Sequence, residues 1–265
     1  MKHAVYLVLL FIGVQLFSGW LGNLLLNIPH LQSGAPLDVT LFSKDPTALG
    51  LSLLFSDVVL IAFTLFLVKT QSKHISVLLL FLSVLVTLPV LFLVNILTES
   101  LHVPDTMNET FYGMKDHWIC VFAIAVVGPI AEEVVFRRGI LGSLLTMRLK
   151  PWCAILLSSI LFGVIHFNPT QMIGATLIGI LFGWFYYRTG NLLPSILAHI
   201  TNNTIGICQL HFTSSPTAST KDLIGNSISL GLLVSIALCL ACVLLICFYK
   251  QTKSHTNDES PLETI

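Results

Sequence analysis

Charged residues are scarce in this chain: they make up 10% of its 265 residues, against roughly 25% in soluble globular proteins. Lys+Arg and Asp+Glu number 13 each, so there is no basic excess, and we expect no nucleic-acid partner. A chain with 55% hydrophobic residues and a mean hydropathy of +0.88 is too apolar for a disordered protein or for a water-soluble domain of this size. These deficits leave a polytopic membrane protein as the class.

Asp, Glu, Lys and Arg are absent from five long stretches, namely residues 3–37, 74–98, 151–187, 189–220 and 223–249. Because a helix needs roughly 20 mostly apolar residues to span a bilayer, the pattern predicts an all-α bundle of about eight transmembrane helices. We expect these helices at about 4–27, 48–68, 75–97, 117–136, 152–167, 171–187, 192–209 and 226–249. Residues 1–250 would then form a single transmembrane domain, and residues 251–265 a disordered cytoplasmic tail.

The stretch 151–187 is long enough for two short spans, and Asn168-Pro169 near its middle is a turn signal. No small-residue cleavage site follows the first segment, so we expect a membrane helix there rather than a removed leader. With both termini in the cytoplasm, ten Lys and Arg residues lie on the cytoplasmic side and three, Lys44, Lys115 and Lys221, on the other. This excess is typical of cytoplasmic loops. It favours a multi-pass protein of the cell membrane, and we expect the bacterial inner membrane.

Two motifs of metal and redox proteins are missing. HExxH is absent, and none of the six cysteines forms a CxxC pair. The cysteines lie in or at the edge of apolar segments, so we interpret them as small membrane-helix residues and expect no disulfide framework. They are Cys120, Cys153, Cys208, Cys239, Cys242 and Cys247.

Ionisable residues inside the predicted spans are few, and such residues are costly in a membrane and commonly functional. Asp57 lies in mid-span, either as a partner for a buried polar group or because the span is shorter than drawn. The others fall into three clusters on separate predicted helices. The full set is Asp57, Glu132, Glu133, Arg137, His166 and His199.

The first cluster is the run EEVVFR at residues 132–137. Glu133 and Arg137 are four residues apart, so they share a helix face and can form an ion pair. Glu132 points about 100° away from Glu133 and has no partner on its own turn. Gly128-Pro129 just upstream is expected to bend the helix and to make room for water beside Glu132. The alternative is an acidic-basic cluster at a cytoplasmic helix end.

The other two clusters are FGVIH at residues 162–166 and HITNN at residues 199–203. Taken alone, His166 is equally a histidine hydrogen-bonded between helices. His199 and Asn203 share a face, where two donors could stabilise an oxyanion or act as polar contacts between helices. Together, a carboxylate, two histidines and an asparagine that turn toward one wet cavity suffice for general-base hydrolysis.

These clusters match three motifs in order: EEVVFR matches EExxxR, FGVIH matches FxxxH and HITNN matches HxxxN. In them the segment at about 117–209 resembles the CPBP family of CAAX proteases and bacteriocin-processing enzymes, which includes the Ras-converting CAAX endopeptidases. The resemblance implies an eight-helix intramembrane endopeptidase of the glutamate type. It covers about a third of the chain and leaves the first three spans and the last without a recognisable signal.

The resemblance also implies roles for the site residues. Glu132 and His166 would activate the attacking water, the HxxxN pair would form the oxyanion hole, and the second glutamate and the arginine would orient the site. The implied catalytic residues are Glu132, Glu133, Arg137, His166, His199 and Asn203. We expect no cofactor. Zinc is the alternative that the sequence leaves open, because Glu132, His166 and His199 also match a two-histidine, one-carboxylate ligand set.

The expected partners are the lipid bilayer and a peptide or lipid-modified protein substrate, either a prenylated CAAX-type protein or a secreted peptide. One alternative is a non-proteolytic membrane scaffold or bacteriocin-immunity protein with the same fold. The presence of all four candidate cavity residues argues against it, since a scaffold does not need them. Another alternative is a transporter with a proton relay, which predicts paired halves with similar broken helices. The sequence has no such internal symmetry.

Overall fold

The computed structural model describes residues 2–69, 72–147, 149–213, 215, 224 and 227–256. Across these ranges the chain is helical, with two π-helical segments and no strand, which confirms the predicted all-α class. In chain order the elements are α1 (Lys2–Leu26), α2 (Ile28–Ser33), α3 (Leu41–Lys44), α4 (Pro46–Leu67), α5 (Val77–Ser100), α6 (Asn108–Met114), α7 (Trp118–Phe122), η1 (Ala123–Val127), α8 (Gly128–Glu133), η2 (Val134–Leu141), α9 (Gly142–Thr146), α10 (Pro151–Val164), α11 (Pro169–Thr189), α12 (Leu193–Phe212) and α14 (Ser227–Thr256).

Caps and prolines set the ends of the main helices. The Asp45 side chain accepts hydrogen bonds from the backbone N–H groups of Thr47 and Ala48, at 2.9 and 3.1 Å, and so caps α4. Helices α4, α10, α11 and α12 each carry a proline in the first turn, where its missing N–H is not needed. Helix α11 begins at Pro169, as the turn signal predicted, and ends at Gly190 with a φ of 62°.

Each of the eight predicted segments coincides with a helical stretch, since α7 through α9 form one continuous run from Trp118 to Thr146. Within the described ranges, however, five stretches are long and apolar enough to cross a membrane. The count of about eight spans is therefore not confirmed. The five stretches are Ala4–Leu26, Pro46–Leu67, Val77–Ser100, Trp118–Thr146 and Ser229–Lys253.

Two helix ends differ from the expected ones, and both lie near the charged clusters. The fourth segment was expected to end at about 136, but the helical run continues to Thr146 and includes Arg137, which is 1% exposed. This arginine lies inside the bundle beside its ion partner, Glu133. Helix α10 ends at Val164 rather than at 167, so His166 lies in the turn beyond it.

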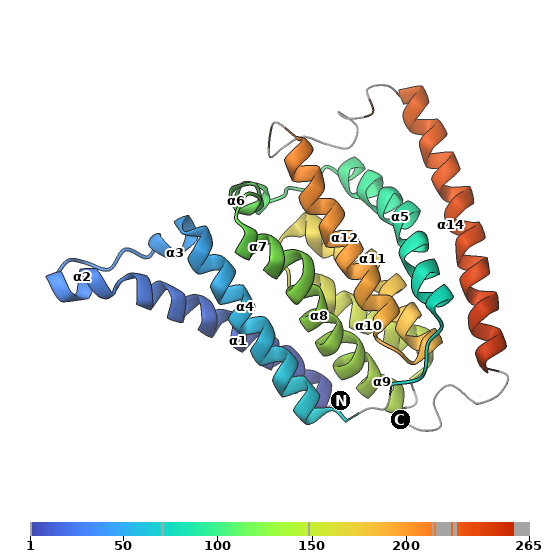
Figure 1. Ribbon diagram of the computed structural model, residues 1–265, viewed down its shortest axis with the longest axis horizontal. Coiled ribbons are helices and arrows are strands. Elements are labelled where there is room, and N and C mark those ends of the chain that lie inside the picture. Colours follow the sequence, from blue (N-terminus) through green and yellow to red (C-terminus); the bar gives the residue numbers. More distant parts are fainter. Residues whose placement is uncertain are drawn as a thin grey trace.

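The central layer is built from α8, α10, α11 and α12, with α1 and α4 on one side and α5 and α14 on the other (Figure 1). Helix α10 packs along α11, α1 along α4, and α14 along α5. One buried apolar cluster joins α1, η2 and α10, and a second joins α5, α11 and α14. The polar site described below lies between these two clusters, inside the layer that they support.

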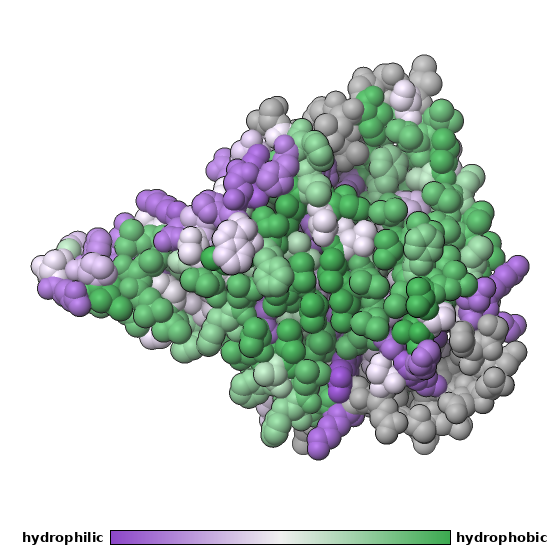
Figure 2. Space-filling model, in the orientation of Figure 1, coloured by the Kyte–Doolittle hydropathy of each residue, from purple (hydrophilic) through white to green (hydrophobic). Residues whose placement is uncertain are grey.

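Apolar side chains cover most of the face seen in Figure 2, and many large ones are exposed, among them Leu16, Phe66 and Val77. A soluble monomer rarely exposes a continuous apolar surface of this kind. Lipid chains can cover such a surface without cost, whereas helices keep their backbone hydrogen bonds satisfied within themselves. The structure is therefore that of a membrane protein.

The predicted tail is only partly described. Helix α14 continues to Thr256, past the expected start of the tail at 251, and residues 257–265 lie outside the described residues. Two residues of the charge count, Arg148 and Lys221, also lie outside them. The first turn of α1 and the last turn of α14 lie at the same end of the bundle (Figure 1). The side of the membrane that this end faces stays a prediction.

A glycine contact between α10 and α11 gives a first testable prediction. A Cβ at Gly163 would overlap the hydroxyl and the backbone carbonyl of the facing residues Thr176 and Met172. We expect Gly163→Ala to lower the free energy of unfolding by about 1–3 kcal/mol, as overpacking does. Thermal unfolding in detergent measures the change.

The matched control is Gly13→Ala, because Gly13 lies inside α1 with no atom within 4 Å of an added Cβ. Alanine is the better helix former by about 0.5–1 kcal/mol, so this variant should be at least as stable as the wild type. Equal melting points for the two variants would contradict the close α10–α11 packing.

Candidate active site

The backbone departs from regular α-helix on both sides of the two glutamates. Residues 123–127 and 134–141 are π-helical and flank the short helix α8, which ends with Glu132 and Glu133. Pro129 in the first turn of α8 lacks an N–H, so the preceding turn cannot keep the regular hydrogen-bond pattern. Wider π-turns of this kind are frequent at functional sites. The bend predicted from Gly128-Pro129 thus takes the form of wider helical turns.

Glu133 and Arg137 form the predicted ion pair, with 3.0 Å between Oε2 of Glu133 and Nε of Arg137. Their side chains are 0% and 1% exposed. The guanidinium also donates to the carbonyl of Gly179 at 3.3 Å. It lies over the rings of Phe162 and Phe182, with 4.5 and 5.6 Å to the ring centroids. This pair therefore ties η2 to both α10 and α11 and is part of the protein interior.

Glycine at position 179 makes this contact possible. A Cβ there would lie 3.0 Å from the ring of Phe162 and 3.4 Å from Nη2 of Arg137. The backbone of α11 can thus approach the guanidinium closely enough for its carbonyl to accept a hydrogen bond. Glycines at positions 174, 179 and 183 of the sequence suit close helix packing, but they do not identify this partner.

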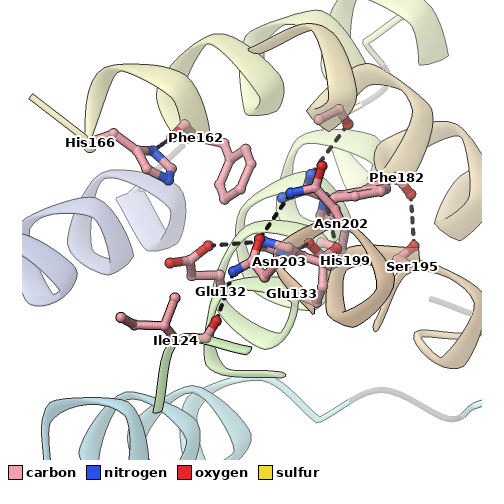
Figure 3. Close-up of polar contacts among 12 residues, drawn as sticks. Ile124, Glu132, Glu133, Phe162, His166, Phe182, Ser195, His199, Asn202 and Asn203 are labelled. Carbon is pink, nitrogen blue, oxygen red and sulfur yellow. Dashed lines mark hydrogen bonds and ion pairs between the residues drawn. The ribbon is translucent and has the colours of Figure 1, made fainter. Parts of the chain in front are cut away.

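His199 lies between the two glutamates. Its Nδ1 donates to Oε1 of Glu133 at 2.8 Å, and its Nε2 lies 3.6 Å from Oε2 of Glu132 (Figure 3). The ring packs against Phe182 and Phe162, with 5.1 and 5.6 Å between centroids. Because Nδ1 carries the proton given to Glu133, the edge of the ring that bears Nε2 is directed at Glu132.

Asn203 lies one helical turn beyond His199 and also points toward the glutamates (Figure 3). Its Nδ2 donates to the carbonyl of Ile124, in the first π-helical segment, at 2.8 Å. Its Oδ1 accepts a hydrogen bond from Asn202 at 2.9 Å. The amide therefore fastens α12 to η1, and one proton of Nδ2 remains for a further acceptor.

His166 follows the end of α10, where its Nδ1 donates to the carbonyl of Phe162 at 2.8 Å. Its Nε2 is then the acceptor in the neutral ring. The turn that carries His166 is held by Asn168, whose side chain accepts from the N–H of Thr106 and donates to Asp105. Phe167, between the two, has a φ of 51°, which is uncommon for a residue other than glycine.

A cavity of about 440 Å³ brings together four of the six predicted residues. A second cavity of about 290 Å³, next to α1, shares Glu132 and His166 with it. Glu132 is 20% exposed, whereas Glu133 and Arg137 lie behind the cavity wall. Two of its lining residues, Asp57 and Asn202, were not assigned to the site from the sequence. The polar residues that line the larger cavity include Asp57, Glu132, His166, His199, Asn202 and Asn203.

Glu132, His166 and His199 are not grouped as metal ligands in this structure. The described residues contain no group of three histidine, cysteine, aspartate or glutamate side chains that could hold a metal ion. Nδ1 of each histidine is bound to a protein oxygen, which leaves Nε2 as the free ring nitrogen, and Nε2 of His199 lies 3.6 Å from a carboxylate oxygen of Glu132.

The fold and the site together define a membrane helical bundle with a candidate hydrolytic centre inside it. A family model described as "Type II CAAX prenyl endopeptidase Rce1-like" matches residues 115–205. The matched segment contains all six predicted site residues, and the match confirms the resemblance stated from the motifs. No solved structure is found to match the chain.

Three curated relatives align with this part of the chain. "Putative membrane peptidase YdiL" of Bacillus subtilis (strain 168) is 34% identical over 86 residues, which are 32% of this chain and 35% of that protein. "UPF0177 protein YxdF" of Lactococcus lactis subsp. lactis (strain IL1403) is 24% identical over 103 residues, 38% of this chain and 56% of that protein. "Uncharacterized protein YyaK" of Bacillus subtilis (strain 168) is 36% identical over 112 residues, 38% and 37% of the two chains. The alignments thus span about a third to a half of these relatives.

The buried ion pair gives a second prediction. Arg137→Met leaves the Glu133 carboxylate buried without its cation, which should cost about 3–5 kcal/mol of unfolding free energy. The double variant Glu133→Gln/Arg137→Met removes both charges and keeps an oxygen that can accept from His199. We expect it to be more stable than Arg137→Met, as measured by thermal unfolding in detergent.

The control is Asp116→Asn, which removes an exposed ion pair with His211 and should shift the midpoint little. If the double variant is as unstable as Arg137→Met, the stability of the site does not depend on balancing these two charges.

Proposed function

We propose that this protein is an intramembrane endopeptidase that hydrolyses a peptide bond in a membrane-associated substrate, with Glu132 as the base that activates water. One observation carries the proposal. Of the two adjacent glutamates, Glu133 is consumed by its bonds to Arg137 and His199, while Glu132 is left facing a cavity lined by two histidines and an asparagine. A carboxylate placed in this way can accept a proton from water held in the cavity.

In the proposed first step, a water molecule gives its proton to Glu132 as its oxygen attacks the carbonyl carbon of the substrate. The carbonyl oxygen then carries the negative charge. The remaining Nδ2 proton of Asn203 is one donor that would stabilise this oxyanion. His199 would be the second donor in its doubly protonated form, with Nδ1–H bound to Glu133 and Nε2–H free for the oxyanion. Donors fixed by the protein need no reorganisation during the reaction, because Glu133 and Ile124 already hold them in place.

In the second step the carbon–nitrogen bond breaks, and the leaving amine needs a proton. Glu132 can return the one that it took from water. His166 can also carry a proton through Nε2, since its Nδ1 is bound to the carbonyl of Phe162. Phe162 packs against both histidine rings and would hold their orientation through the two steps.

The proposed substrate is a prenylated CAAX-type protein or a secreted peptide, reached from within the bilayer. The first is the class that the description of the matched family names, and the exposed apolar surface of the bundle is suited to lipid. The proposed location is the cell membrane, with both termini in the cytoplasm, as the excess of Lys and Arg on that side predicts.

A comparison of protein termini tests the proposal. Membranes and medium from cells that produce the wild type or Glu132→Gln are compared for all amino and carboxyl termini. The substitution keeps the shape and removes the base, so at least one precursor should accumulate and its cut product should fall by about 10²–10⁴-fold. The same experiment identifies the substrate and the cut site.

Glu109→Gln is the matched control, because Glu109 is exposed on α6 and does not line the cavity. The termini in this strain should equal those of the wild type. Identical termini in all three strains would contradict a protease. If the phenotype of the gene also persisted in Glu132→Gln, a non-proteolytic scaffold would take its place.

Metal removal gives a further prediction. Because the candidate ligands do not converge on one position, we propose that catalysis needs no zinc ion. Treatment of the purified protein with a strong chelator, followed by its removal, should leave cleavage of a peptide spanning the identified cut site unchanged. Loss of cleavage that added zinc restores would contradict this and would make Glu132, His166 and His199 the first ligands to test.

A further inference from the structure

Asp57 is a buried carboxyl that neither the motifs nor the proposed steps use. It lies near the middle of α4, which extends from Pro46 to Leu67, so its position is not explained by a shorter span. Its side chain is 4% exposed and lines the same cavity as Glu132 and His199. The sequence left two interpretations of Asp57 open, a shorter span or a partner for a buried polar group. The second interpretation remains.

Asp57 forms no hydrogen bond or ion pair with any described residue. A buried carboxyl without a partner costs free energy, and an aspartate in a membrane helix is costly in itself. The cavity beside it has about 440 Å³, room for several water molecules at roughly 30 Å³ each. Water in this cavity is therefore the hydrogen-bond partner that we expect for the Asp57 carboxyl.

The geometry places this water next to the proposed base. A Cβ at Gly128 would lie 3.6 Å from Oδ2 of Asp57, so the carboxyl rests against the bare backbone at that position. Gly128 and Glu132 are four residues apart and share a face of α8, with a rise of about 6 Å between them. The two carboxyls thus line one cavity, with Asp57 against α8 about one helical turn before Glu132.

No other charged group competes for Asp57 among the described residues of the elements packed against α4, which are α1, α3, α7, η1, α8 and η2. Cys120 binds the carbonyl of Pro46 at the start of α4, and Arg138 binds that of Val68 at its end. Arg137 is paired with Glu133. Glu132 of α8 lines the same cavity as Asp57.

We propose that Asp57 is a second water-binding carboxyl of the site, which holds the attacking water by a hydrogen bond while Glu132 takes its proton. The inference rests on the proposed function. In the step itself, one oxygen–hydrogen bond of water breaks as its proton passes to Glu132, and the oxygen of water bonds to the carbonyl carbon. The π electron pair of the carbonyl moves to its oxygen, which becomes the oxyanion, while Asp57 keeps its hydrogen bond to the water oxygen or to its second proton. Asp57 is thus a catalytic residue by contact with a reacting molecule, and it gains or loses no covalent bond.

The test uses three purified variants in lipid vesicles, with a synthetic peptide that spans the cut site found by the comparison of termini. Asp57→Asn keeps the shape and the hydrogen bonds, so its kcat should stay within about tenfold of the wild type. Asp57→Leu removes the hydrogen bond, and misplacement of the water should lower kcat by about 10²-fold with KM unchanged. Ser56→Ala is the control, because Ser56 is the buried neighbour on α4 and does not line the cavity.

The melting temperature separates this role from a structural one. Replacing an unpartnered buried carboxyl with an apolar side chain is neutral or stabilising, so Asp57→Leu should melt at or above the wild-type temperature while it loses activity. A lower melting temperature together with the loss of activity would make Asp57 a structural residue and overturn the inference. Wild-type kcat in Asp57→Leu, a loss in Asp57→Asn equal to that in Asp57→Leu, or a change in KM alone would overturn it as well.

Glu132→Gln in the same assay keeps the two proposals apart. If the wild type cleaves the peptide, Glu132→Gln does not, and Asp57→Leu is fully active, the proposed function stands and only the role of Asp57 fails. If Glu132→Gln cleaves as fast as the wild type, the proposed function fails and the role of Asp57 fails with it.

Discussion

The buried ion pair between Glu133 and Arg137 is the interaction on which the rest of the site depends. Two full charges at 0% and 1% exposure are tolerated in a membrane bundle only when each is matched by good geometry and further hydrogen bonds. Here the carbonyl of Gly179 accepts a hydrogen bond from the guanidinium and the ring of Phe162 lies against it, while Nη1 of Arg137 has no hydrogen-bond partner among the described residues. The same pair lets the helical run pass the position where a charge would otherwise end a span.

From this pair the positions of the other groups follow. Glu133 also accepts the hydrogen bond from His199, which turns the other edge of that ring toward Glu132. Asn203, one turn further on α12, is bound to the carbonyl of Ile124 in the first π-helical segment. Two adjacent glutamates thus take different places: one is built into the wall, and the other faces the cavity. Their separation follows from the 100° between successive residues of a helix.

The polar residues of the cavity lower the hydropathy of the helices that carry them. Helices α11 and α12 are 21 and 20 residues long, yet they are not among the five stretches apolar enough to cross a membrane on composition alone. Both contribute polar side chains to the cavity, such as Gln171 from α11 and Asn202 from α12. The polar residues that line the cavity thus also lower the hydropathy by which a membrane-spanning helix is recognised.

Much of this could be predicted from the sequence, because charge in an apolar chain is rare and its spacing is informative. The all-α class, the positions of the helices, the Glu133–Arg137 pair and the turn at Pro169 all follow from local periodicity. The fourth helical stretch continues past its expected end at about 136 to Thr146, because local periodicity does not show where a helix that buries its arginine ends. The contacts of Arg137 with Phe182 and Gly179 and the approach of Asp57 to Gly128 depend on how distant helices pack, and the sequence carries no local signal for them.

The most direct test of the account is hydrolysis by the purified protein in lipid vesicles prepared in heavy-oxygen water. The substrate is the peptide across the cut site, and mass spectrometry reads the new carboxyl terminus. The account predicts a wild-type product whose new carboxyl group carries oxygen from water, and loss of that product with Glu132→Gln. Equal amounts of labelled product from the wild type and from Glu132→Gln would contradict the central claim that Glu132 activates the attacking water.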